Sequence, residues 1–413
     1  MKNRFATLKH NLLVFLAVAG PGIITGNVDN DAGGIATYSA AGARFGYRML
    51  WILFIITFSL AIVQEMCARM GTVTGKGLGD LIRETFGIRI TVLAMLALIA
   101  ANLANTAGEF AGIAAGFEIF GVSRYISVPL CALGVWWLVV RGSYKVVERF
   151  YMAFCILFGT YVISGVLARP NWGGVLTDMV RPTFSWDPAF VTMSITIIGT
   201  TIAPWMQFYQ QSAIRDKGLT VKDLPMERID TYIGSFLTNF VAFFIVVACG
   251  AVLFPKGITI DTADQAAVAL APLAGKYCGL LFAAGLINAS IMAASILPLT
   301  TAYAVAEALG FEGSLEVKSG ESSAFYWLYT AMVAIGAAMV LMPNVDFMKI
   351  MLFSQTVNGV LLPLILYFML RIINNCKIMG NHTNNQLENI ITWSQAAVLV
   401  ALTAVMLVQT FVH

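Results

Sequence analysis

Long stretches without charged residues recur eleven times along the chain and are separated by short polar segments. A membrane-spanning helix needs roughly 20 mostly apolar residues, so these stretches are long enough, or nearly so, to cross a bilayer. They cover residues 11–28, 49–64, 90–108, 125–140, 150–168, 188–214, 231–255, 277–306, 322–345, 350–370 and 389–413. Neighbouring residues such as Glu65 or Glu109 complete the shorter ones. The pattern predicts an all-α membrane protein with eleven transmembrane helices.

The composition supports a membrane protein and excludes a soluble enzyme. Of the 413 residues, 59% are hydrophobic and 11% are charged, whereas soluble domains are about 45–50% apolar and about 25% charged. The net charge of +3 is small, so nucleic acid is not an expected partner. The six cysteines stand singly, without the paired spacing of a disulfide framework or a zinc site.

The distribution of Lys and Arg predicts the orientation, because cytoplasmic segments carry the excess of these residues. With the N-terminus inside and eleven spans, 17 of the 25 Lys and Arg residues fall in inside segments. The bias places the N-terminus in the cytoplasm, as in a bacterial inner-membrane protein, and the C-terminus outside.

Two of the eleven spans contain residues that a continuous membrane helix avoids. The first, over residues 20–34, has five glycines, a proline and the carboxylates of Asp29 and Asp31. The sixth, over residues 197–207, has a glycine, two threonines and Pro204. Interrupted segments at corresponding places of two halves point to a transporter binding site at mid-membrane. Two ordinary proline kinks are the alternative, but they leave the mid-membrane carboxylates without a partner, and a transported cation supplies one.

At these residues the sequence resembles the Nramp family of divalent metal transporters. The resemblance is carried by Asp31-Ala32-Gly33-Gly34 with its continuation through residues 35–37 and 41–51, by residues 64–75, by Ala203-Pro204-Trp205, and by Ser354-Gln355 with Pro363. It implies the LeuT-type fold, in which two inverted five-helix repeats form one transporter domain, here residues 1–413. The repeats are expected at about residues 10–170 and 187–373, and the extra helix at about 390–412.

The resemblance also implies a metal site between the broken first and sixth helices. Asp31 keeps the family's aspartate, whereas Gly34 stands in place of its asparagine and Ala203 in place of its methionine. The carbonyl of Thr200 takes the place of the backbone ligand, and Gln207 is placed only loosely. This combination resembles the Nramp-related magnesium transporter branch rather than the manganese and iron importers.

The chemistry of these residues agrees with that branch. A thioether favours transition metals, whereas carboxylate, carbonyl and water suit Mg²⁺. Magnesium keeps several of its waters, and the small Gly34 and Ala203 are expected to leave room for them. Asp29 and Asp31 supply the charge, while Asn27, Thr200 and Gln207 are candidates to hold bound water. Alternatively, Asp29 caps the second half of the first helix.

The same comparison predicts transport of Mg²⁺, and also of Mn²⁺, without proton coupling. Trp205 stands in place of the family's histidine, and Asn102 and Asn105 stand in place of two acidic residues of the third helix. A proton-coupled Mn²⁺/Fe²⁺ importer is the alternative, and a sodium-coupled carrier of a small organic solute is a further one. No nucleophile–base pair points to an enzyme. The metal ion is expected as the transported substrate, no cofactor is expected, and the sequence does not give the oligomeric state.

Overall fold

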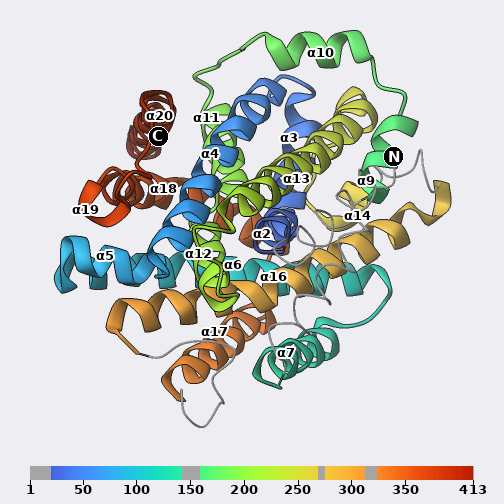
Figure 1. Ribbon diagram of the computed structural model, residues 1–413. Coiled ribbons are helices and arrows are strands. Elements are labelled where there is room, and N and C mark those ends of the chain that lie inside the picture. Colours follow the sequence, from blue (N-terminus) through green and yellow to red (C-terminus); the bar gives the residue numbers. More distant parts are fainter. Residues whose placement is uncertain (1–19, 142–158, 268–274, 312–322, 413) are drawn as a thin grey trace, which may run out of the picture.

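The computed structural model describes residues 20–141, 159–267, 275–311 and 323–412, and every regular element in these ranges is a helix (Figure 1). Within them, nine helical segments are long and apolar enough to cross a membrane. These are α4 (Leu50–Thr74), α6 (Ile88–Ile119), α7 (Arg124–Arg141), α11 with α12 (Pro188–Thr201 and Pro204–Asp216), α13 (Leu224–Val252), α16 (Cys278–Leu309), α17 (Ser323–Leu341), α18 (Phe347–Ile373) and α20 (Gln386–Val412). The all-α prediction is confirmed.

The first and fifth predicted spans lie partly outside the described residues. Residues 11–19 and 150–158 belong to that part, and the described remainder is α2 (Pro21–Val28) and α9 (Gly159–Leu167). Short helices occupy the connections. They are α5 (Leu78–Phe86), α10 (Trp172–Val180), α14 (Ala263–Ala267), α19 (Cys376–Met379) and the 3₁₀ turns η2 (Phe254–Lys256) and η4 (Gly275–Tyr277).

The first broken helix extends further than the charge pattern predicts. The charge-free run that predicted this span ends at residue 28, and the interrupted segment was expected over residues 20–34. The chain is helical again in α3 (Ala32–Phe45), after a gap of only Asp29, Asn30 and Asp31. The charge-free run inside α3 is shorter than a full span, because Asp31 and Arg44 bound it. With 14 residues, α3 alone is too short for a span of roughly 20 residues.

The second break separates α11 from α12 and consists of Ile202 and Ala203. Ala203 has extended dihedral angles, and Pro204 occupies the first position of α12. Proline fits there because its missing N–H is one that a helix start leaves without a partner anyway. The local sequence therefore ends one helix and starts the next within two residues.

The two broken helices lie at the centre of the bundle. α13 packs along α2, α3 and α4, and α11 packs against α18 and α3. Figure 1 shows α2 near the middle of the view and α20 at the periphery, where it contacts α18. Glycines allow the closest approaches: a Cβ added at Gly26 would lie 2.6 Å from the backbone oxygen of Gly234. Because backbones in such close contact cannot shift past each other, this packing fixes the positions of the breaks.

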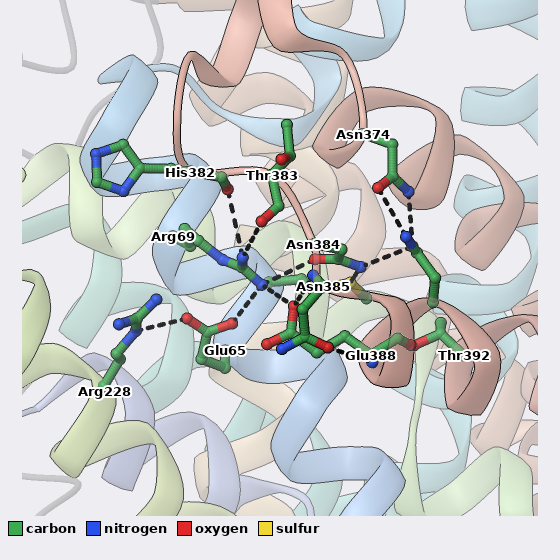
Figure 2. A network of polar contacts seen from close by, with 12 residues as sticks. Glu65, Arg69, Arg228, Asn374, His382, Thr383, Asn384, Asn385, Glu388 and Thr392 are labelled. Carbon is green, nitrogen blue, oxygen red and sulfur yellow. Dashed lines mark hydrogen bonds and ion pairs between the residues drawn. The ribbon is translucent and has the colours of Figure 1, made fainter.

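A polar network joins the last helix to the body of the protein (Figure 2). Arg69 of α4 lies 2.8 Å from Glu65 and 3.1 Å from Glu388 of α20, and it also donates to the backbone oxygen of Thr383 at 3.0 Å. Arg228 of α13 binds the other oxygen of Glu65 at 2.7 Å. A buried guanidinium needs such partners, so this network anchors α20 and the segment before it to α4 and α13.

Candidate metal site between the broken helices

Asp31 is the N-cap of α3 and is held there by the backbone. Its Oδ1 accepts a hydrogen bond of 2.6 Å from the N–H of Gly34, and its side chain is buried. The free N–H groups and the dipole of a helix N-terminus stabilise a negative charge at this point. The amide of Gln355 on α18 approaches both carboxylate oxygens, at 3.4 and 3.5 Å. Asp31 is thus fixed at the gap with its charge stabilised by α3.

Asp29 lies at the other side of the gap, as the C-cap of α2. The residue is 2% exposed, and neither carboxylate oxygen has a hydrogen-bond partner among the described residues. The alternative that Asp29 caps α3 is therefore wrong, because Asp31 takes that place. A buried carboxylate without donors is costly unless water, a proton or a cation is bound to it. Asp29 is free to serve an ion or its waters.

Glu109 is a further carboxyl group at this gap, and the sequence did not identify it as a site residue. It lies on α6, is fully buried, and its Oε2 accepts a hydrogen bond of 3.1 Å from the N–H of Ala32. Its carboxyl and that of Asp31 lie at the same helix start, since Asp31 is the N-cap of α3 and Ala32 its first residue. Its Oε1 has no partner within the described part of the chain. In the sequence, Glu109 stands out only as a carboxylate at the end of a charge-free run. That position does not reveal which residue it contacts.

The second break contributes neutral oxygens to the same region. The carbonyl of Thr200 lacks the usual helical partner, because the residue four positions later is Pro204. The Thr200 hydroxyl is also buried without a partner in the described ranges. A Cβ added at Gly34 would lie 3.4 Å from this hydroxyl, 3.3 Å from Asp31 Oδ1 and 2.8 Å from the backbone oxygen of Asp29. The structure therefore brings Asp29, Asp31, Gly34 and Thr200 together.

The remaining sequence candidates have local roles. Ala203 is the N-cap of α12, and its carbonyl accepts from the N–H of Met206 at 3.0 Å. In the orientation that satisfies its amide, Gln207 donates to the carbonyls of Ala203 and Pro204, each at 2.8 Å. Asn27 donates to the carbonyl of Ile23 at 2.8 Å. These bonds stabilise the two half-helices, and among the described residues neither Gln207 nor Asn27 forms a hydrogen bond with Asp31.

A chain of amides leads from Asp31 to α6. The Oε1 of Gln355 accepts from Asn358 at 2.9 Å, and Asn358 exchanges two hydrogen bonds with Asn105, at 2.7 and 3.2 Å. One turn away on α6, Asn102 donates to Thr301 at 2.9 Å. Amide groups do not gain or lose protons at the pH values of ordinary aqueous solutions. These hydrogen bonds therefore orient the Gln355 amide toward Asp31 but do not carry a proton.

The donor set at the gap consists of hard oxygen atoms. It offers carboxylates, a backbone carbonyl and a hydroxyl, and the resolved helices hold no group of three or more His, Cys, Asp or Glu residues spaced to bind a metal. Oxygen donors of this kind suit Mg²⁺, Ca²⁺ and Mn²⁺ rather than softer metals. The site fits a cation that keeps part of its water.

A cavity of about 820 Å³ lies at the C-terminal end of α6. It reaches Ala115 of α6 and Met348 of α18. Ala115 follows Glu109 by six residues, a distance of about 9 Å along a helix. Glu118, Asp261 and Asp346 contribute carboxylates to the cavity wall and Arg124 a guanidinium. The cavity brings solvent to within about two helical turns of the gap.

The paired broken helices and the buried oxygen donors define an integral, multi-pass membrane protein of the transporter class. The family model described as "Natural resistance-associated macrophage protein-like" matches residues 22–409. The chain therefore belongs to the Nramp family. The predicted resemblance is confirmed.

Relatives and solved structures agree with this membership. The chain is 24% identical to the divalent metal cation transporter MntH of Bacillus subtilis, over 97% of this chain and 93% of the relative. It is 27% identical to MntH of Ralstonia nicotianae, over 93% and 89%. A manganese transporter structure from Eremococcus coleocola matches with a TM-score of 0.75 at 19% identity, over 94% of this chain and 85% of that chain. MhsT in complex with L-phenylalanine matches with a TM-score of 0.60 at 15% identity, over 94% and 97%. These likenesses confirm the predicted LeuT-type fold.

Proposed function

We propose that the chain is a divalent metal cation transporter that moves Mg²⁺, and also Mn²⁺, through the gap between α2/α3 and α11/α12. The observation that carries this proposal is the buried pair of Asp31 and Glu109 beside the unpartnered carboxylate of Asp29. Negative charge of this density in mid-membrane calls for a cation. The relatives named as divalent metal cation transporters support the class of substrate.

The preference for Mg²⁺ rests on what the second break lacks. Ala203 gives the site no sulfur or imidazole, so nothing favours a soft transition metal over a hard cation. Mg²⁺ uses one or two carboxylates and keeps several waters, and the orphaned hydroxyl of Thr200 is placed to bind such a water. Mn²⁺ also accepts oxygen ligands, so this site discriminates poorly against it.

The proposed orientation places the cavity on the outer side of a bacterial cytoplasmic membrane. It follows from the positive-inside rule with the N-terminus in the cytoplasm. Glu118, Asp261 and Asp346 then face the outside and raise the local concentration of cations. A negative interior drives each transported charge inward with about 2.3 kcal/mol per 100 mV. We assign the two repeats to about residues 10–170 and 187–373, within one transporter domain.

The proposal does not include proton coupling, because amides occupy the path from Asp31 through Gln355, Asn358 and Asn105. The alternative of a proton-coupled Mn²⁺/Fe²⁺ importer has one observation in its favour. Glu109 accepts a hydrogen bond from the N–H of Ala32, next to Asp31, and a carboxyl group can exchange protons. The experiment therefore measures both fluxes.

The test reconstitutes the full chain into proteoliposomes with a fixed potassium diffusion potential. Mg²⁺ and Mn²⁺ entry is followed with a metal-sensitive dye and internal pH with a second dye. We expect entry of both metals, faster at a negative interior, with no change of internal pH, and no metal entry with Asp31→Asn. Undiminished entry with Asp31→Asn would refute the site. Acidification in step with metal entry would refute uncoupled transport and establish the coupled importer.

A further inference from the structure

A second group of buried oxygens lies at the opposite end of α2 from the metal gap. Asp230 of α13 accepts hydrogen bonds from the N–H groups of Gly20, at 3.2 Å, and Gly22, at 2.7 Å, through its Oδ2. It therefore caps the start of α2. Thr231, the next residue, accepts from Gln210 of α12 at 2.8 Å. Three helices, α2, α12 and α13, thus meet at this point, near the centre of the view in Figure 1.

Four oxygen atoms in this group have no hydrogen-bond partner in the described ranges. They are both carboxylate oxygens of Glu227, the Oδ1 of Asp230 and the Oε1 of Gln210. All three residues are fully buried. Glu227 and Asp230 lie three positions apart on one face of α13, so their charges repel each other. An uncompensated buried carboxylate is expensive, and two in contact are more so.

A cationic side chain among the described residues acts on both members of this pair. Lys217 acts electrostatically on both carboxylates and is only partly buried. Two buried carboxylates on one face of α13 and a neutral amide oxygen form a set of ligands that a divalent cation would satisfy. Carboxylate and amide oxygens are the ligands that Mg²⁺, Ca²⁺ and Mn²⁺ prefer. The unpartnered amide oxygen of Gln210 supplies a neutral ligand of the same hard type.

We propose that Glu227, Asp230 and Gln210 form a second divalent-cation site at the N-terminal end of α2. This site rests on the proposed function, since it would hold the ion that leaves the central gap. α2 has eight residues, so the two sites lie about 12 Å apart along this half-helix. Under the proposed orientation the second site is the inner one, and an ion released from Asp29 and Asp31 reaches it along α2. Asp230 binds the ion through Oδ1 while its Oδ2 keeps the cap on α2.

The test counts Mn²⁺ ions bound to the purified full chain, by electron paramagnetic resonance of free Mn²⁺ at saturating metal. We expect two bound ions in the unaltered chain, one with Asp31→Asn, one with Glu227→Gln, and none with both substitutions. Glu84→Gln, at an exposed carboxylate on α5, is the matched control and is expected to retain two. Size-exclusion elution and helical circular dichroism establish that each variant is folded.

The outcomes separate the inner site from the central one. The Asp31→Asn variant tests the second site with Glu227 intact, so the inference stays testable even if Glu227→Gln fails to fold. Loss of all Mn²⁺ in Asp31→Asn, or two ions retained in a folded Glu227→Gln, would overturn the inner site. One ion in the unaltered chain that persists in Asp31→Asn and disappears in Glu227→Gln would instead support the inner site and refute the central one.

Discussion

The two breaks at the centre of the protein share a geometry but differ in charge. The first separates α2 from α3 by three residues, two of which are the aspartates Asp29 and Asp31. The second separates α11 from α12 by Ile202 and Ala203, which carry no charge. In the first break the cap of the following helix is a carboxylate, and in the second it is the backbone of Ala203 before Pro204.

This difference assigns the two breaks separate tasks. Under the proposed function, the first break, joined by Glu109 from α6, holds the negative charge that attracts a cation. The second offers a carbonyl and a hydroxyl at Thr200, which suit an ion or its waters without adding charge. Binding strength should therefore depend on the first break, and selectivity among divalent ions on the second. The predictions below test this division, starting with the largest expected effect.

Removing the charge of Asp31 should have the largest effect. Asp31→Asn keeps an oxygen for the N–H of Gly34, so α3 remains capped. Loss of a buried charge that binds a partner costs about 2–5 kcal/mol, so the Kd for Mg²⁺ and Mn²⁺ should rise at least about 30-fold. Isothermal titration calorimetry on the purified chain measures it. Asp178→Asn on α10 is the control, and equal affinities in the two variants would contradict the assignment.

Neutralising Glu109 should have the next largest effect. Glu109→Gln preserves an acceptor for the N–H of Ala32 and removes only the charge beside Asp31. Groups that support a metal ligand typically change metal affinity by about 10–100-fold, so we expect a loss of roughly tenfold. The same titration on Glu84→Gln, at an exposed carboxylate of α5, should show little change. A Glu109→Gln variant with unaltered affinity would limit the charge of the site to the two aspartates.

The sequence predicted the breaks but not the distribution of tasks within them. Glycines, prolines and two aspartates in otherwise apolar runs were enough to place both interruptions, because each has a strong local backbone effect. Which aspartate caps α3 depends on where that helix starts, and a shift of two residues exchanges their roles. Glu109 lies 77 residues from its partner Ala32. That contact results from the packing of α6 against α3, which no local pattern in the sequence specifies.

A side chain at Gly34 should disturb the first break. An added Cβ would lie 2.8 Å from the backbone oxygen of Asp29, so the backbone must move. Overpacking typically costs about 1–3 kcal/mol, and we expect Gly34→Ala to weaken Mg²⁺ binding by roughly fivefold. Gly134→Ala on α7 is the control, because a Cβ there meets nothing within 4 Å. Asparagine at position 34 has the same Cβ and a larger side chain, so it should weaken Mg²⁺ binding more than alanine. Unchanged binding in Gly34→Ala would show that the gap is more open than its backbone contacts indicate.

A thioether at the second break should change selectivity more than affinity. Ala203→Met places sulfur beside the carbonyls of the gap, and sulfur favours softer metals. We expect the affinity ratio of Cd²⁺ or Mn²⁺ to Mg²⁺ to rise by about threefold, which is less than 1 kcal/mol. Ala203→Leu introduces similar bulk without sulfur and should leave the ratio unchanged. An equal shift in both variants would attribute selectivity to volume rather than to ligand softness.

The smallest effect is expected when a hydrogen bond between the two breaks is removed and every charge and proposed metal ligand is kept. The hydroxyl of Tyr38 on α3 lies 2.9 Å from that of Thr201 at the end of α11, and both residues are buried. Tyr38→Phe removes this bond, while Thr201 keeps its bond of 2.7 Å to the carbonyl of Ile197. The net value of one such hydrogen bond is about 0.5–1.5 kcal/mol, so the apparent melting temperature should fall by a few degrees or less. The Kd for Mg²⁺ should change less than about twofold, because both aspartates and the oxygens of Thr200 stay in place. Fluorescence-detected thermal unfolding and calorimetry test the two statements, with Tyr367→Phe on the exposed face of α18 as control. If Tyr38→Phe weakened binding as much as Glu109→Gln, the two breaks would act as one unit, and the division between charge and selectivity would fail.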